Sequence, residues 1–124
     1  MNVFRANEVD DDWARVRAEL DRAFQMSRSA AQAEQSFVYV VHHDDLLGRR
    51  GAGNAMVAAG LLSAARTAAL EGSRRGWTVN VLAYDDSVEP EAIDEWVQWL
   101  AGDSRGLTGE VLRLGAGHLG KTLP

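Results

Sequence analysis

The sequence predicts an α/β protein in which a short parallel sheet lies between layers of helices. Residues 37–41 form an unbroken apolar run rich in β-branched and aromatic residues, which is typical of a strand buried on both faces. Residues 54–73 are alanine-rich and lack proline, so they predict a long helix, and Gly76 ends it. Residues 77–83 predict a second strand. Together these segments make one βαβ unit, for which a right-handed crossover is expected.

The remaining elements flank this unit and give the order helix–strand–helix–strand–helix–strand. Three aspartates at 10–12 precede apolar residues spaced by three and four, which predicts an amphipathic helix over 11–35. Pro90 suits the first turn of another helix, which Gly102 ends. Residues 109–114 predict the third strand. Residues 1–9 are mixed in character, so they are either a frayed arm or a fragment of strand.

Composition limits the class of protein. The chain has 124 residues, a net charge of −5 and a pI near 5.1, so we expect one domain over residues 1–124 and no nucleic-acid partner. It has no cysteine, which excludes disulfides and zinc–thiolate sites. No apolar run reaches the roughly 18 residues of a membrane-spanning helix, and no signal pattern is evident. A cytoplasmic protein without a membrane partner is therefore expected.

Two glycine motifs resemble parts of nucleotide-binding sites. Residues 115–122 match the phosphate-binding pattern G-x-x-x-x-G-K-[ST], but that chemistry needs a following helix, and only two residues follow in this sequence. Residues 51–53 begin a G-x-G-x-x-G pattern, but Met56 replaces its last glycine and the motif lies ten residues beyond the strand. Neither motif predicts a nucleotide site.

His42, His43, Asp44 and Asp45 form the most polar cluster at the end of a predicted strand. Sites in parallel sheets lie at the carboxyl ends of strands, and these residue types can bind a metal or move a proton. Adjacent loop residues rarely point the same way, so a solvated loop is the favoured interpretation. A metal or proton-transfer site remains the alternative.

Several segments resemble the C-terminal half of the short-chain dehydrogenase/reductase family over residues 10–117. The strand 37–41 resembles the one that ends at the family's catalytic serine, and 78–83, Thr-Val-Asn-Val-Leu-Ala, resembles its R-V-N-A-V-A strand. The stretch 107–113, Leu-Thr-Gly-Glu-Val-Leu-Arg, resembles its I-T-G-E-V-L-R ending and is the most specific part. The resemblance implies a truncated Rossmann-like fold, a three-layer sandwich.

The chain departs from the family where catalysis would occur. The family's asparagine falls on Glu19, its serine on His42 or His43, its tyrosine on Met56 and its lysine on Gly60. The family's reaction needs a phenol as acid and base, assisted by the lysine. The glycine-rich dinucleotide turn has no counterpart in this sequence, and the loop after the strand 77–83 is too short for the family's substrate lid. We therefore expect a pseudoenzyme with no catalytic residues, cofactor or metal.

In the family the helices matching 11–35 and 54–75 build a dimer interface as a four-helix bundle, and both are retained here. The resemblance implies a homodimer or higher oligomer, or a complex with a full-length relative. We also expect the strand 37–41 to be an unprotected sheet edge. An enzyme or a small-molecule-binding module that uses the 42–45 loop is the alternative function. The expected interface residues are Trp13, Leu20, Phe24, Ala55, Ala59, Leu62, Arg66 and Ala69.

Overall fold

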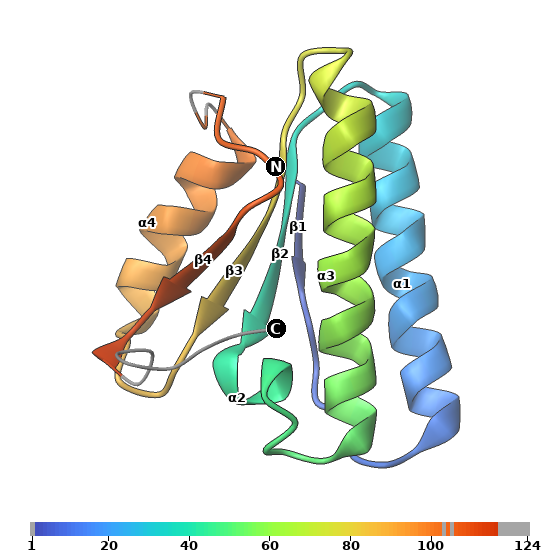
Figure 1. Ribbon diagram of the computed structural model, residues 1–124, viewed down its shortest axis with the longest axis vertical. Helices are drawn as coiled ribbons and strands as arrows, with labels where there is room; N and C mark the ends of the chain where they lie inside the picture. Colours follow the sequence, from blue (N-terminus) through green and yellow to red (C-terminus); the bar gives the residue numbers. More distant parts are fainter. Residues whose placement is uncertain (1, 103, 105, 117–124) are drawn as a thin grey trace.

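The computed structural model describes residues 2–102, 104 and 106–116, which form a parallel sheet of four strands and the helices around it (Figure 1). Residues 117–122 of the phosphate-binding pattern lie outside the described residues. The sheet order is β1-β2-β3-β4, and every neighbouring pair is parallel. The elements are β1 (Asn2–Arg5), α1 (Trp13–Gln32), β2 (Phe37–His42), α2 (His43–Leu46), α3 (Ala52–Ser73), β3 (Val79–Tyr84), α4 (Pro90–Ala101) and β4 (Val111–Leu114).

The sheet separates two hydrophobic cores, as the alternation of side chains along a strand requires. Phe37, Tyr39 and Val41 of β2 face α1 and α3, whereas Val38 and Val40 face α4. All six residues of β2 are buried, which confirms the strand expected to be buried on both faces. The result is the predicted three-layer α/β arrangement, with α4 on one side of the sheet and α1 and α3 on the other (Figure 1).

The connection through α4 has the opposite hand to the two before it. The strand order advances in one direction from β1 to β4, but α1 and α3 cover one face and α4 covers the other. Such a change of hand is rare in parallel sheets. The return segment is held by the buried side chain of Asn80, whose Nδ2 donates to Leu107 O at 2.8 Å and whose Oδ1 accepts from the Glu110 backbone N–H at 3.2 Å.

The fourth strand corrects one expectation. β1 pairs with β2, so residues 37–41 are not a sheet edge, and β1 and β4 are the outer strands of the described sheet. Phe4 is the buried anchor of β1: its ring meets Tyr39 edge-on, and the Arg22 guanidinium lies 4.1 Å from its centroid. A strand of four residues with polar ends is too short to show a period in the sequence.

Helix α1 is shorter than the sequence pattern suggested. α1 begins at Trp13 because the Asp12 carboxylate accepts from the backbone N–H groups of Ala14 and Arg15, and it ends at Gln32 rather than residue 35. Glu34 follows with φ of 54°, a left-handed conformation that stops the helix. The polar run 42–45, expected to be a loop, lies largely in the short helix α2.

Helix α3 approaches the rest of the chain closely at Gly72. A Cβ built at Gly72 lies 2.5 Å from the Trp77 ring and from the Trp77 carbonyl oxygen, so the contact admits only glycine. At Gly60, on the same helix, an added Cβ meets only the flexible end of Leu20, at 3.2 Å. The Trp77 ring in turn stacks on Phe37 of β2, with centroids 5.9 Å apart. Gly72 therefore lets the end of α3 pack directly on the sheet.

We predict that Gly72→Ala lowers the free energy of unfolding by about 1–3 kcal/mol, because overpacking at Trp77 exceeds the gain in helix propensity. The matched variant Gly60→Ala, in the same helix, is expected to be neutral or slightly stabilising. Urea unfolding followed by circular dichroism measures both. Equal destabilisation by the two substitutions would contradict the close-packing argument.

Candidate functional site

The polar cluster after β2 is built around His42. This residue caps α2: its Nδ1 accepts from the Asp44 backbone N–H at 3.1 Å. Since Nδ1 is an acceptor, the neutral ring carries its proton on Nε2, which donates to the Asp86 carboxylate at 2.8 Å. Both ring nitrogens are therefore engaged in holding α2 and the loop after β3. The ring has no spare nitrogen with which to accept a proton from a substrate.

Asp45 serves a second structural contact. Its buried carboxylate accepts from Arg50 Nε at 2.9 Å and from Arg50 Nη2 at 2.8 Å. This paired contact raises the pKa of Arg50 above its ordinary value. Arg50 also donates from Nη1 to Glu8 at 2.7 Å, which ties the loop before α3 to the segment after β1. Asp44 lies nearer the surface, with Arg49 Nη1 at 3.5 Å from its carboxylate.

The cluster does not gather into a metal site. Among the described residues, no group of three or more histidine, aspartate or glutamate side chains is placed to hold a metal ion. His43 is buried, and its Nδ1 is 3.7 Å from the Asp44 carboxylate. The side chains of residues 42–45 thus diverge into local contacts. The sequence favoured a solvated loop. The structure corrects this interpretation, because three of the four side chains, those of His42, His43 and Asp45, are buried.

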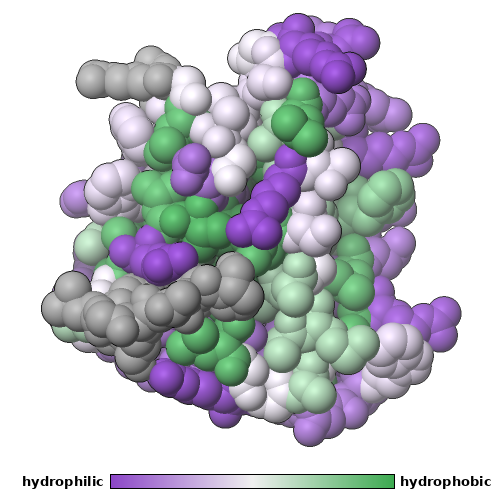
Figure 2. Space-filling model, viewed as in Figure 1, coloured by the Kyte–Doolittle hydropathy of each residue, from purple (hydrophilic) through white to green (hydrophobic). Residues whose placement is uncertain are grey.

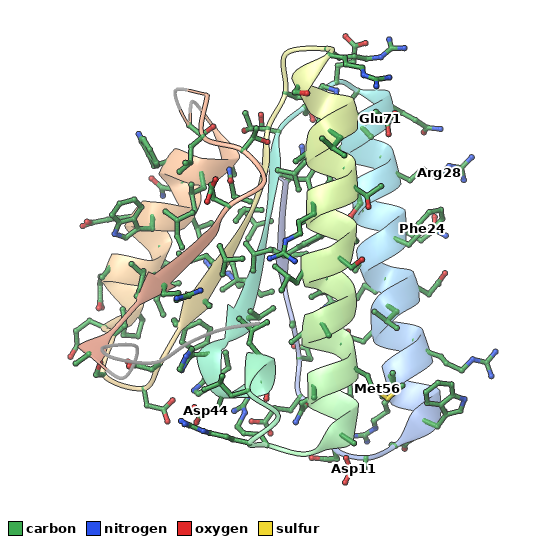
Figure 3. All side chains as sticks on the ribbon, viewed as in Figure 1. Asp11, Phe24, Arg28, Asp44, Met56 and Glu71 are labelled. Atoms are coloured by element: carbon green, nitrogen blue, oxygen red, sulfur yellow. The ribbon has the colours of Figure 1, made fainter. Side chains whose placement is uncertain are left out.

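The other positions matched to the family's catalytic residues are also used differently. Glu19 is buried and accepts from the Asn7 backbone N–H at 2.5 Å and from Arg22 at 2.9 Å, so it ties α1 to the end of β1. Met56 is 46% exposed, near the lower ends of α1 and α3 (Figure 3). Gly60 faces Leu20 of α1. Met56 and Gly60 carry no acid or base, and the Glu19 carboxylate is engaged by Asn7 and Arg22.

The second candidate site is the outer surface of α1 and α3, which we call the helix layer. It carries most of the large exposed apolar side chains of the described residues: Leu70 is 71% exposed, Trp13 and Phe24 are each 58% exposed, and Met56 belongs to the same surface. Phe24 and Arg28 project from α1 away from the sheet (Figure 3). The lower half of α3 presents a pale green surface of weakly apolar side chains (Figure 2). A surface of this kind typically meets another protein.

The expected interface residues differ in how much of each side chain is exposed to solvent. Trp13, Phe24, Ala59 and Arg66 are exposed on the helix layer, and Leu20, Ala55 and Leu62 are partly buried. Ala69 is buried within this chain, in the core between α3 and the sheet, so no partner can cover it. The sequence did not identify Met56 and Leu70 as interface residues, although both side chains are exposed. Met56 lies three residues before Ala59, and Leu70 lies four residues after Arg66. These helical spacings are the signal that places all four on one face of α3.

A groove of about 720 Å³ separates α1 from α3 within this layer. Its floor is aromatic, formed by Phe37, Tyr39 and Trp77. The Tyr39 hydroxyl shares a hydrogen bond of 2.6 Å with Ser27, and burial raises the pKa of Tyr39. The Arg75–Glu34 ion pair, at 3.1 Å, lies among the residues that line the groove. The groove thus combines an apolar floor with a charged rim.

Solved structures of known proteins share this fold. The TT0495 protein from Thermus thermophilus matches with a TM-score of 0.79 at 21% identity, over 98% of this chain and 70% of that one. An enoyl-[acyl-carrier-protein] reductase (NADH) from Aquifex aeolicus VF5 matches with a TM-score of 0.74 at 16% identity, over 96% of this chain. An oxidoreductase of the short-chain dehydrogenase/reductase family from Burkholderia thailandensis matches at 0.75 and 19% identity, over 97% of this chain and 65% of that one.

At these identities the likeness shows the fold alone, which is the Rossmann-like α/β fold of short-chain dehydrogenases/reductases. This chain spans 63% of the length of the Aquifex aeolicus reductase. No protein-family model and no curated protein matches the sequence. Within the described residues, no helix is both long and apolar enough to cross a membrane.

We predict that Asp45→Asn lowers the free energy of unfolding by about 1–3 kcal/mol, because it weakens two charge-assisted bonds to Arg50 at a buried position. Asp44→Asn changes a more exposed contact and serves as the matched control, with an expected loss below about 0.5 kcal/mol. Urea denaturation at neutral pH compares the two variants. The structural role assigned to this loop would be contradicted by a larger loss at Asp44 than at Asp45.

Proposed function

We propose that this chain is a non-catalytic, short-chain-dehydrogenase-like pseudoenzyme that serves as an interaction or structural subunit. Its partner is a second copy of the chain or a full-length relative of the same fold, and the helix layer is the contact surface. The observation that carries the proposal is the exposure of Trp13, Phe24 and Leu70 along the length of that layer. Burying each such side chain contributes about 1.5–3 kcal/mol, and tryptophan is enriched among residues that dominate binding.

The positions matched to the family's tyrosine and lysine carry no acid–base group, which supports a non-catalytic role. A thioether at Met56 cannot donate a proton, and Gly60 has no side chain with which to lower the pKa of a neighbour. His42 uses both ring nitrogens in hydrogen bonds to Asp44 and Asp86. The alternative function, an altered chemistry at the 42–45 loop, finds no free group there to carry it.

The charges on the helix layer suit a contact between two copies. Arg28 of α1 and Glu71 of α3 both line the rim of the groove, from opposite helices. A two-fold axis places each patch against the same patch of the other copy, in the opposite orientation. Because the patch carries both signs of charge, Arg28 of one copy can pair with Glu71 of the other. The short residues Gly60 and Ala64, which also line the groove, favour a close approach of helices.

We predict that Ala59→Glu and Phe24→Arg each dissociate the assembly, because they place a charge where apolar surface is covered. Sedimentation at micromolar concentration is expected to give an oligomer for the parent chain and a smaller species for both variants. The melting temperature of the parent is expected to rise with protein concentration.

The matched control is Gln98→Glu, an added charge on the exposed side of α4, on the opposite face of the sheet. This variant is expected to remain oligomeric. A parent chain that sediments as a stable monomer, with a melting temperature independent of concentration, refutes the proposed role of the helix layer.

We further predict that this chain alone does not bind NADH or NADPH, because no described strand runs through a glycine-rich turn directly into a helix. Isothermal titration calorimetry with either nucleotide is expected to show no saturable heat. Micromolar binding would contradict the pseudoenzyme proposal while leaving the contact surface on α1 and α3 untouched.

A further inference from the structure

The outer surface of α4 carries two exposed tryptophans that the proposed interface does not use. Trp96 is 39% exposed and Trp99 is 38% exposed, and α4 lies on the opposite side of the sheet from the helix layer (Figure 1). Their ring planes stand at 89° with centroids 5.7 Å apart, so the two indoles form a corner. Large aromatic side chains at the surface are informative because most of their kind are buried.

A carboxylate completes this corner. Glu95 and the two tryptophans line a shallow hollow of about 350 Å³. Glu95 lies one helical turn from Trp99, a spacing at which side chains meet on a helix surface. Within the part of the chain that the structure describes, no ion pair engages Glu95, whereas its neighbour Asp94 is bound by Arg5 at 2.8 Å.

The surroundings of the corner are anionic. Every charged residue of α4 is acidic, namely Glu91, Asp94 and Glu95, and Glu89 occupies the N-cap position. The face of an indole ring is also electronegative and attracts cations. Two indoles beside a carboxylate therefore select a positive group. A guanidinium fits best, because its flat surface stacks on an indole while its N–H fork donates to a carboxylate.

We propose that the corner of Glu95, Trp96 and Trp99 is a docking site for an arginine side chain on a basic segment of another protein. A second copy of this chain is a poor occupant, since a two-fold contact through α4 would bring the acidic residues of one α4 against those of the other, and like charges across an interface repel. A purely apolar partner would strip water from Glu95 without replacing its hydrogen bonds. A basic partner provides both a cation for the indole rings and hydrogen-bond donors for the Glu95 carboxylate.

The test uses the whole chain labelled with ¹⁵N and a short peptide of alternating arginine and glycine. The expected result is a saturable shift of the indole N–H signals of Trp96 and Trp99, with those of Trp13 and Trp77 unchanged. A peptide in which citrulline replaces arginine keeps the shape without the charge and is expected to cause no shift. A lysine–glycine peptide is expected to bind more weakly than the arginine peptide.

Two variants locate the site. Glu95→Gln and Trp96→Ala are each expected to weaken the arginine peptide about three- to tenfold. Gln98→Ala, at an exposed position of α4 that does not line the hollow, is expected to leave the affinity unchanged. Circular dichroism checks that all three variants fold. The proposal is overturned by equal binding of the citrulline or lysine peptide, by full affinity in both site variants, or by no shift at millimolar arginine peptide. The sedimentation test of the helix layer is independent of every one of these results.

Discussion

The rest of the structure depends on the complete burial of β2. Its first five residues alternate between two cores, so the strand is stable only if both faces and both edges are covered. β1 and β3 supply the edges, α1 and α3 cover one face, and α4 covers the other. A fully apolar strand in water exposes a row of unpaired backbone groups, which invites aggregation. The short strand β1, anchored by Phe4, removes that hazard on one side.

The two faces of the sheet are covered by different means, and this difference creates two surfaces. Two long helices lie side by side over one core and leave a groove between them, whose aromatic floor comes from β2 and from Trp77, just before β3. A single helix covers the other core and turns its acidic, tryptophan-bearing side outward. The first surface is apolar with charges of both signs, and the second is aromatic with charges of one sign. On these grounds we propose self-association for the first surface and a basic partner for the second.

The candidate sites were only partly predictable from the sequence. The apolar spacing of Trp13 and Phe24 on a helix is visible in the sequence, but spacing alone does not tell a core-facing stripe from an exposed one. Ala69 illustrates this limit, since it was expected at an interface and lies in the core. The polar run 42–45 was recognisable as a cluster, whereas its hydrogen bonds to Asp86 and Arg50 come from residues that the chain brings near only by folding.

The sequence by itself determined the class of fold, because hydrophobic periodicity and helix-ending residues act locally: the run 37–41, the alanine-rich helix and Gly76 each specify their own conformation. Tertiary structure decided the rest. Residues 2–5 become a strand only because β2 offers them an edge, and the hand of the connection through α4 depends on how Asn80 holds the chain between α4 and β4. Which aromatic side chains remain in water is likewise a property of the packed layers, since burial depends on contacts between segments far apart in the chain.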